Sequence, residues 1–265
     1  MQPTQEKKAT AFRALHEGEA FVIPNPWDAG SARVMEALGF KALATTSSGF
    51  AFTLGRLDGG VTLDELAEHV RILDRATSLP VSVDLEHGFG PDPDDAAAAI
   101  ARAAEAGAVG GSIEDNDPQA GIYAFDHAVE RVTAAAEAAH GLDFPFAFTA
   151  RAENHIRGNP DIDDTIARLQ AFEQAGADVL FAPGLRSVEE IRAVCGAVSK
   201  PVNVLAHPGL SMAEIVDAGA QRISVGGSLA WAAVEAMASA AERIRDEGDF
   251  SGLAAPTRVR EWLDG

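Results

Sequence analysis

Two pairs of acidic residues follow strand-like segments of the sequence. Asp84 and Glu86 stand in VSVDLEHGFG, where an apolar run ends in a glycine-rich loop, and a second run, Val109–Ile113, ends in Glu114 and Asp115. Side chains two apart on a strand point the same way, so Asp84 and Glu86 can face one site. Acids at neighbouring strand ends can hold a hard cation such as Mg²⁺. The alternative is that these acids are helix caps or solvated loop residues.

The acids lie within a regular alternation of strand-like and helical segments. The strand-like runs are Ala20–Pro24, Ala42–Thr46, Val81–Asp84, Val109–Glu114, Phe146–Ala150, Val179–Ala182, Val202–Leu205 and Arg222–Val225. Helical patterns separate them, and several end at a glycine just before the next strand, such as Gly107 or Gly176. Eight such alternations predict a (β/α)₈ TIM barrel. An open doubly wound sheet is the rival, but no GxGxxG turn follows the first strand.

The two ends of the chain carry further helical patterns. Residues 1–18 contain a short amphipathic helix, with Phe12 and Leu15 on one side. Near the other end, Leu229–Asp246 reads as a long alanine-rich helix, and the apolar residues after it would pack on the barrel or on a partner subunit: Phe250, Trp262 and Leu263. No linker or break in composition divides the chain, so we expect residues 1–265 to form one domain.

Composition and charge exclude several classes of protein. The chain has 21 Lys and Arg against 40 Asp and Glu, a formal charge of −19 that argues against binding to nucleic acid or to anionic membranes. Its single cysteine, Cys195, excludes an intrachain disulfide and a cysteine-rich zinc site. The start, MQPTQEKKAT, lacks the apolar segment of a signal peptide, and no apolar run of about 18 residues occurs. We therefore expect a soluble cytoplasmic protein.

On a (β/α)₈ barrel, the residues that close the strands form the functional site. Arg151 closes the fifth strand in TARAEN and could hold a carboxylate through two hydrogen bonds, or simply pair with Glu153. Asn154, in the same loop, could contact a substrate or be an ordinary loop residue. No lysine closes a strand, so a Schiff-base aldolase mechanism, which needs a lysine amine, is not expected.

Histidines and a glycine-rich turn offer two other kinds of site. His87, His155 and His207 each follow a strand, but their spacing matches no ligand motif such as HxH, so a histidine-bound zinc is not favoured. Residues Gly226–Ser228 follow the eighth strand, where many barrels bind phosphate through backbone amides. Tight packing between a strand and a helix would require the same residues.

Five stretches together resemble the isocitrate lyase / phosphoenolpyruvate mutase superfamily. PNPWDAGSARVMEALGF resembles its opening P-x-x-x-D-A-x-S-A-x-x-x-E-x-x-GF, and TTSSGFAFTLGRLDGGVT resembles S-G-x followed by LG-x-x-D. VSVDLEHGFG resembles the D-x-D-x-G-[YF]-G loop, SIEDN the IED motif and FTARAEN the AR-x-E motif. The stretches occur in the family's order and span most of the predicted barrel, which makes the set specific.

The resemblance implies a Mg²⁺ or Mn²⁺ site, a 2-oxo-acid or enolpyruvyl ligand, and a homo-oligomer, dimer or tetramer, in which the eighth helix is exchanged between subunits. The implied metal-binding residues, acting largely through water, are Asp84, Glu86 and Glu114. The implied substrate-binding residues are Ser48, Gly49 and Phe50, mainly through backbone N–H groups on a carboxylate. Asp58 would lie close to the reacting centre, and Arg151 would bind the substrate's oxygens.

The loop after the fourth strand departs from the family's best-known members. Isocitrate and 2-methylisocitrate lyases carry a K-[KR]-C-G-H loop, whereas EDNDPQAGIYAFDHAVERV contains neither cysteine nor lysine. The phosphonate-forming mutases carry EDK followed by PK-x-N, which this loop also lacks. Glu86 stands where the family usually has aspartate, so the carboxylate arm is one methylene longer.

The sequence therefore favours Mg²⁺-dependent cleavage of a C–C bond in a small 2-oxo or 2-hydroxy carboxylate, through an enolpyruvate-type intermediate. A metal chelated by such an acid would stabilise the enolate left when the bond breaks. One alternative is P–C bond chemistry, as in a phosphonopyruvate hydrolase or a phosphoenolpyruvate mutase. A second is a barrel that binds its 2-oxo acid with a metal but does not turn it over.

Overall fold

Eight parallel strands form the central sheet of the protein. In the computed structural model, which describes residues 2–254 and 258–263, they pair in the order β1–β10–β9–β8–β7–β4–β3–β2. Their bounds are β1 (Phe21–Ile23), β2 (Leu43–Ala44), β3 (Val81–Asp84), β4 (Gly110–Glu114), β7 (Ala147–Arg151), β8 (Val179–Phe181), β9 (Val202–Leu205) and β10 (Arg222–Ser224). The edges β1 and β2 approach each other where the N–H of Ala44 donates to the Pro24 carbonyl at 3.0 Å. The predicted (β/α)₈ barrel is confirmed.

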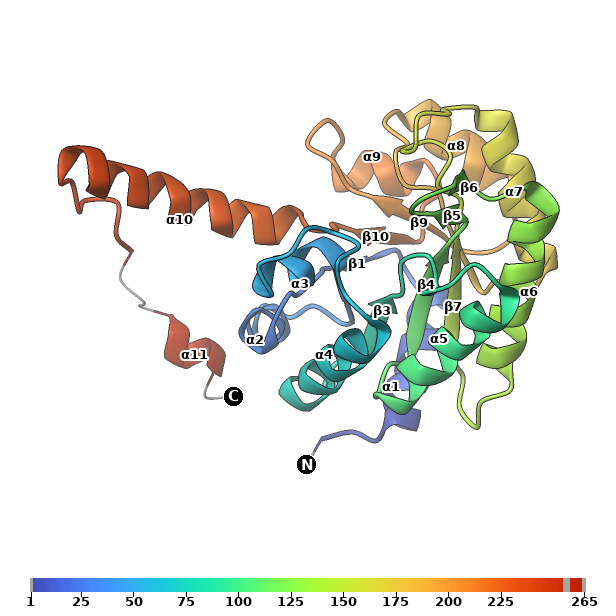
Figure 1. Ribbon diagram of the computed structural model, residues 1–265, viewed down its shortest axis with the longest axis horizontal. Coiled ribbons are helices and arrows are strands. Elements are labelled where there is room, and N and C mark those ends of the chain that lie inside the picture. Colours follow the sequence, from blue (N-terminus) through green and yellow to red (C-terminus); the bar gives the residue numbers. More distant parts are fainter. Residues whose placement is uncertain (1, 255–257, 264–265) are drawn as a thin grey trace.

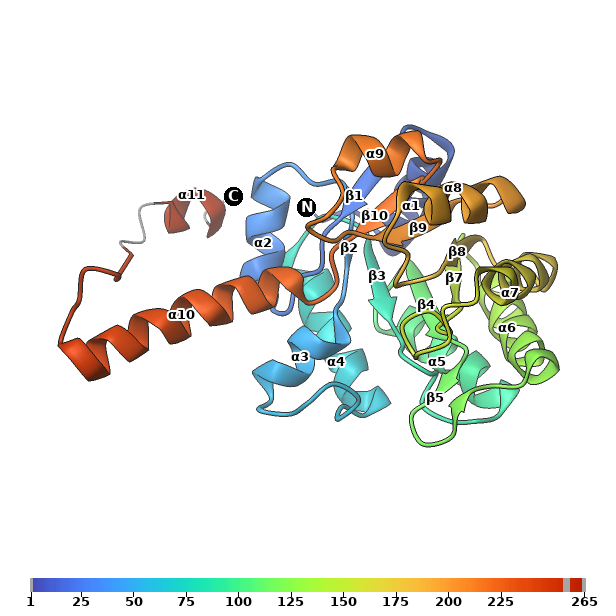
Figure 2. The same cartoon turned by 90° about the horizontal axis from the view of Figure 1, so that it is seen from above.

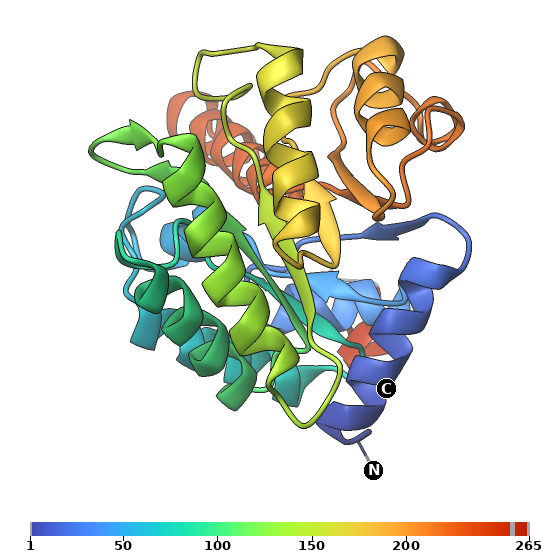
Figure 3. The same ribbon diagram turned by 90° about the vertical axis from the view of Figure 1, so that its right-hand side faces the viewer.

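Helices cover the outside of the barrel between successive strands. They are α2 (Ala29–Ala37), α3 (Ser47–Thr53), α4 (Leu63–Ala76), α5 (Pro93–Glu105), α6 (Phe125–His140), α7 (Ile162–Gln174), α8 (Val188–Ala197) and α9 (Met212–Asp217). In Figure 3, α5 and α6 (green) and α7 (yellow) lie side by side across the strands. Small buried side chains such as Ala99 and Ala135 pack between them, and capping boxes at Thr62 and Ser187 begin α4 and α8. The helices thus hold the strand ends in fixed positions.

The two ends of the barrel are built differently. At the amino ends of the strands, α1 (Gln5–Glu17) buries Phe12 against Phe21 and Val109, as its amphipathic pattern predicts. Figure 1 shows α1 at the opposite end from a small hairpin, β5 (Asn116–Asp117) and β6 (Gly121–Ile122), which follows β4. The hairpin was not predicted, because strands of two residues carry no readable alternation.

The predicted long helix near the end of the chain is α10 (Ser228–Glu247), and it projects away from the barrel (Figures 1 and 2). Its only fully buried residue is Ala230, whereas Met237 is 61% exposed and Phe250, beyond the helix, is 64% exposed. Phe250 therefore does not pack on the barrel. Trp262 and Leu263 belong to α11 (Val259–Leu263), which lies beside the barrel helix α2. Exchange of α10 between subunits stays a prediction.

The prediction of one domain over residues 1–265 includes positions 1, 255–257 and 264–265, which lie outside the described residues. Among the described helices, none combines the length and apolar character needed to cross a membrane.

Candidate active site

A cavity of about 160 Å³ opens inside the barrel and reaches the carboxyl ends of the strands. Of the predicted site residues, Ser48, Asp84 and Arg151 line it. Asn25, which was not predicted, ties the mouth together: its Oδ1 accepts from the N–H groups of Val225 and Gly226 at 2.9 Å. The cavity is therefore bordered by the first, second and eighth barrel strands as well as by the acidic ones.

The guanidinium of Arg151 is surrounded by carboxylates. Its Nη1 lies 3.0 Å from Asp84 Oδ1, and its Nη2 lies 3.0 Å from Glu114 Oε1 and 2.8 Å from Glu153 Oε1. Burial alone would lower the pKa of Arg151, but Glu114, Glu153 and Asp84 raise it above its ordinary value. Arg151 thus pairs with Glu153, as one of the two interpretations predicted, and also faces the predicted metal-site acids. Its binding of a substrate carboxylate stays a prediction.

Glu86 reaches this cluster by a turn rather than by strand alternation. Strand β3 ends at Asp84, and Glu86 adopts a left-handed conformation with φ +49°, its N–H donating to Asp84 Oδ1 at 3.3 Å. The carboxylates of Asp84 and Glu86 lie close together, as expected, but a turn after β3 brings them together rather than the two-residue period of a strand. A residue other than glycine is strained in the left-handed conformation, and such residues concentrate at functional sites.

Glu114 ends β4 between two arginines. In addition to Arg151, its Oε2 is 3.3 Å from Nη2 of Arg157, a half-exposed residue in the loop after β7. Arg157 also lies 3.5 Å from Glu153, so it completes the ring of charges around the acids. Sequence reasoning missed Arg157, although its position six residues after Arg151 in the same loop was a usable signal.

Two carboxylates of the cluster are held in an unfavourable environment. Burial, with Asp84, Asp58 and Glu114 adding negative potential, raises the pKa of Glu86 to about 8. Burial also raises the pKa of Glu114, against the opposing effect of Arg151. Both carboxylates would be stabilised by a further cation. Perturbed pKa values of this kind cluster at functional sites.

The acids provide the kind of ligand atoms that a divalent cation needs, but they do not surround one position closely enough to coordinate it directly. Carboxylate oxygens are the ligands that Mg²⁺ and Mn²⁺ prefer. Within residues 2–254 and 258–263, no three His, Cys, Asp or Glu side chains stand close enough together to hold a metal ion directly. Binding largely through water, as the family resemblance implies, agrees with this geometry, because Mg²⁺ usually keeps several waters.

The predicted carboxylate-binding segment forms the first turn of α3. Thr46 caps the helix: its Oγ1 accepts from Gly49 N–H at 3.3 Å, and its carbonyl accepts from Phe50 N–H at 3.0 Å. Two of the three predicted amides are therefore engaged within the turn, while the N–H of Ser48 has no acceptor inside the helix. Gly49 is needed for packing, since a Cβ there would lie 2.6 Å from Thr46 Cγ2.

Two further predicted site residues, Asp58 and Asn154, lie outside the cluster of ion pairs around Arg151. Asp58 lies in an exposed loop close enough to raise the pKa of Glu86. Asn154 is fully buried, and its amide bonds to Thr165 Oγ1 at 2.8 Å and to the Asp161 carbonyl at 3.1 Å. The structure brings Asp58 to the site and does not bring Asn154 to the cavity.

The polar groups of Asp117 and Tyr123, in the hairpin after β4, bond to groups of the same segment rather than facing the cavity. Asp117 accepts from the N–H groups of Gln119 and Ala120 at 2.7 Å, and from the hydroxyl of Tyr123 at 3.4 Å. The Tyr123 ring stacks under the guanidinium of Arg131, which donates to carbonyls of the loop after β3. None of these side chains lines the cavity.

Comparison with known proteins identifies the family. A family model described as phosphoenolpyruvate phosphomutase matches residues 12–245. The chain belongs to the phosphoenolpyruvate mutase/isocitrate lyase superfamily. An oxaloacetate decarboxylase of Rhodopseudomonas palustris (strain HaA2) is 32% identical over 262 residues, which cover 93% of this chain and 89% of the relative.

Solved structures of superfamily members have the same architecture. A Burkholderia cenocepacia J2315 protein described as a candidate lyase/mutase is 50% identical, with a TM-score of 0.95 over 98% of this chain and 97% of the other. A 2,3-dimethylmalate lyase of the superfamily is 27% identical, with a TM-score of 0.84 over 99% of this chain and 95% of the other. The protein is thus an enzyme of the superfamily's lyase type, which acts on C–C or P–C bonds.

Proposed function

We propose that this superfamily member is a Mg²⁺- or Mn²⁺-dependent lyase that cleaves a C–C bond in a small 2-oxo or 2-hydroxy carboxylate through an enolpyruvate-type intermediate. The charge balance of the cluster is the observation that carries the proposal. Four carboxylates converge there, those of Asp84, Glu86, Glu114 and Glu153, whereas among the described residues only Arg151 and Arg157 supply positive charge. When all four are ionised, as metal binding requires, the cluster has an excess of two negative charges, which matches one divalent cation.

Asp84, Glu86 and Glu114 would hold the metal, largely through water. When bound there, the metal would polarise the substrate's 2-oxo group and stabilise the negative charge that develops on its oxygen. The surrounding ion pairs fix the acids before substrate arrives, since Arg151 bonds to both Asp84 and Glu114. Such preorganisation supplies much of the rate enhancement in enzymes of this kind.

The chain's own residues would bind and orient the acid. Ser48 lines the cavity, and its N–H, which has no acceptor inside α3, is suited to a carboxylate. Arg151 lines the cavity as well, and the N–H of Nη1 that its neighbouring acids leave unused would donate to the substrate's oxygens. Asp58, beside Glu86 at the exposed rim, is the proposed catalytic carboxylate nearest the reacting centre.

The names of the relatives support cleavage next to a 2-oxo or 2-hydroxy acid. Oxaloacetate decarboxylase and 2,3-dimethylmalate lyase both act on small dicarboxylates, each breaking a C–C bond. The cavity of about 160 Å³ excludes large substrates unless the rim opens.

The test is an NMR time course with Mg²⁺ and a panel of acids: oxaloacetate, 2,3-dimethylmalate, 2-methylisocitrate, isocitrate, phosphonopyruvate and phosphoenolpyruvate. We expect metal-dependent product from one C–C substrate, abolished by EDTA. Asp84→Ala should lower the rate by at least about 10³-fold, because it removes a metal-binding carboxylate.

A matched control is Asp143→Asn, which changes an acid in the loop before β7, at the amino end of the barrel. It should leave the rate within about twofold of wild type, since the loop is remote from the site. Full activity in Asp84→Ala would contradict the placement of the metal site. Silence over the whole panel, with oxalate still raising the melting temperature in the presence of Mg²⁺, would favour a metal-dependent binder instead.

P–C bond chemistry is the second candidate, and the phosphoenolpyruvate phosphomutase model that matches residues 12–245 favours it. The same panel separates the two candidates. Inorganic phosphate released from phosphonopyruvate would indicate a hydrolase, and interconversion with phosphoenolpyruvate would indicate a mutase.

We also propose that the protein is a homo-oligomer, a dimer or tetramer. The exposed apolar side chains of α10, such as Trp231 and Met237, support this, because they have little cover from their own chain. Light scattering should give a mass of two or four times 27.7 kDa. A monomer at micromolar concentration would contradict the proposal.

A further inference from the structure

A second arginine lies inside the barrel without any carboxylate beside it. Arg222 begins β10, is 5% exposed, and is held by three neutral groups. Its Nε donates to Asn203 Oδ1 at 2.9 Å, its Nη2 to Thr149 Oγ1 at 3.0 Å, and its Nη1 to His16 Nε2 at 3.2 Å. Among the described residues, no carboxylate oxygen lies within 4.0 Å of its guanidinium.

The charge on Arg222 is therefore uncompensated. Burial lowers the pKa of Arg222 to about 9, and no neighbouring acid raises it. The side chain still carries its proton at neutral pH, because this pKa lies above 7. An isolated buried charge destabilises the fold unless an opposite charge accompanies it.

The guanidinium also has donors to spare. It carries five N–H groups, and the three bonds to Asn203, Thr149 and His16 use three of them. Arg222 lines the same 160 Å³ cavity as Arg151, and Ser82 and Ser224 are also among its lining residues. The cavity is polar there and large enough for an ion the size of one or two waters.

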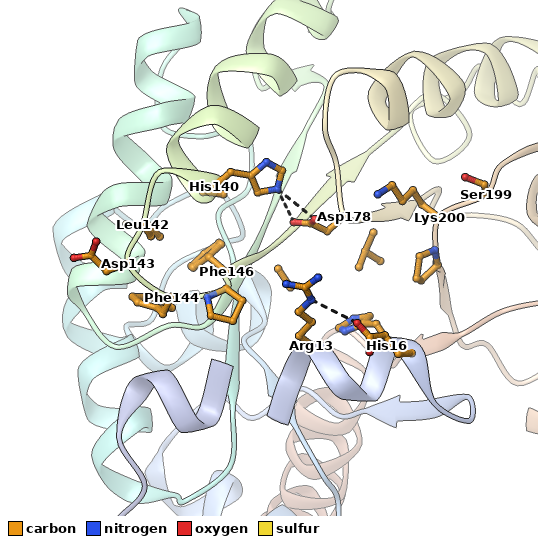
Figure 4. Close-up of a pocket in the computed structure, with 16 residues that line it drawn as sticks. Arg13, His16, His140, Leu142, Asp143, Phe144, Phe146, Asp178, Ser199 and Lys200 are labelled. Carbon is orange, nitrogen blue, oxygen red and sulfur yellow. Dashed lines mark hydrogen bonds and ion pairs between the residues drawn. The ribbon is translucent and has the colours of Figure 1, made fainter. Parts of the chain in front are cut away.

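The place of Arg222 relative to the active site is set by β7. Thr149, which accepts from Arg222, stands two residues before Arg151 on one face of the strand, so the two levels are about 7 Å apart. On the other side, His16 lines a separate cavity of about 820 Å³ at the amino end of the barrel, next to Arg13 (Figure 4). Arg222 and His16 thus separate the active-site cavity from the outer one.

We propose that Arg222 binds a small monovalent anion in the inner part of the active-site cavity, either an inorganic ion such as chloride or a carboxylate group of the bound acid. The two spare N–H groups would donate to the anion, and the anion would neutralise the only charge of the cluster formed by Arg222, His16, Asn203 and Thr149. The inorganic source is independent of the proposed function, whereas the carboxylate source rests on it.

The test is thermal unfolding of the full chain in EDTA, at constant ionic strength, as sodium gluconate is replaced by sodium chloride or sodium formate. Wild type should gain about 3–5 °C at a tenfold excess over the dissociation constant, and above that constant the gain should rise with the logarithm of the anion concentration. Arg222→Met, which keeps an unbranched apolar stem but not the guanidinium or its charge, should lose this dependence. Arg13→Met is the matched control, and it should keep the dependence because Arg13 lines only the outer cavity.

Two results would overturn the proposal. One is a wild-type melting temperature that does not distinguish chloride and formate from gluconate, supported by ³⁵Cl NMR lines that show no saturable broadening; this measurement needs no variant to fold. The other is loss of the dependence in Arg13→Met but not in Arg222→Met, which would place the anion in the outer cavity. If Arg222→Met does not fold, Arg222→Lys, which keeps the charge but not the fork, should weaken chloride binding at least about tenfold.

Calorimetry with L-malate and Mg²⁺ identifies the source of the anion. If saturating chloride weakens malate binding about tenfold or more, a carboxylate of the acid occupies the Arg222 position. If malate binds equally in chloride and gluconate, the anion is inorganic. If malate does not bind at all, the proposed substrate class is weakened while the chloride result on Arg222 stands unchanged.

Discussion

Arg151 and Arg222 line one cavity and have opposite surroundings. Arg151 is within 3.0 Å of carboxylates from Asp84, Glu114 and Glu153, whereas Arg222 bonds only to neutral side chains. At the carboxyl end of the barrel, negative charge therefore exceeds positive charge, and at the inner end a positive charge stands alone. The first arrangement favours a cation and the second an anion, so one barrel interior can hold groups of both signs.

The difference also predicts opposite pH responses at the two ends. Buried acids such as Glu86 are destabilised when charged, and so is the buried imidazole of His16 beside Arg222. An acid becomes charged as pH rises, and a histidine becomes charged as pH falls. The three predictions below use this contrast, beginning with the largest expected effect.

Removing the guanidinium of Arg151 should cause the largest loss. Arg151→Met would leave Asp84 without its cation, and Glu114 and Glu153 with the half-exposed Arg157 alone, so the free energy of unfolding in EDTA should fall by about 3–5 kcal/mol. Urea denaturation measures this loss in the free energy of unfolding. Arg151→Lys keeps the charge but not the fork, so it should lose less stability yet weaken substrate binding strongly. A loss under about 1 kcal/mol in Arg151→Met would contradict this prediction, because it would show that the acid cluster is stable without the charge of Arg151.

Glu86 should make the metal-free protein less stable as pH rises. Its pKa is about 8 when folded and near 4.5 when unfolded, so its contribution is fully present below pH 4.5 and is lost as pH approaches 8. The slope is at most about 1.4 kcal/mol per pH unit. Melting temperatures of wild type and Glu86→Gln in EDTA, from pH 5 to pH 8, should converge as pH falls. Parallel curves would contradict the raised pKa.

His16 should act in the opposite direction at the inner end. Burial first, and then the charge of Arg222, lower the pKa of His16 to about 3, while its bond to the Phe12 carbonyl opposes the shift. Because the unfolded pKa is 6.5, stability is present above that pH and is lost as pH falls toward 3. His16→Gln, measured in gluconate, should flatten the decline of melting temperature between pH 6.5 and pH 4.5. An unchanged decline would assign it to other groups.

Much of the fold could be predicted from local patterns. The predicted run Phe146–Ala150 corresponds to β7, Ala147–Arg151, and the predicted helix Leu229–Asp246 corresponds to α10, Ser228–Glu247. These agreements follow from hydrophobic period and glycine stops, which depend on neighbours in the sequence. The same patterns placed Asp84, Glu114 and Arg151 at strand ends, where the barrel brings them together.

The barrel, its strand ends and the acid-rich character of its carboxyl end can all be predicted from the amino-acid sequence. Three features of the site cannot, since they depend on the folded chain: Glu86 arrives through a left-handed turn, Arg157 pairs with Glu114, and Asn154 bonds away from the cavity. The tertiary structure alone placed Arg222 beside His16, a residue 206 positions away in the chain. The reason is physical: strand and helix periods are local, whereas the neighbours of a side chain inside a closed barrel depend on how distant strands register against one another.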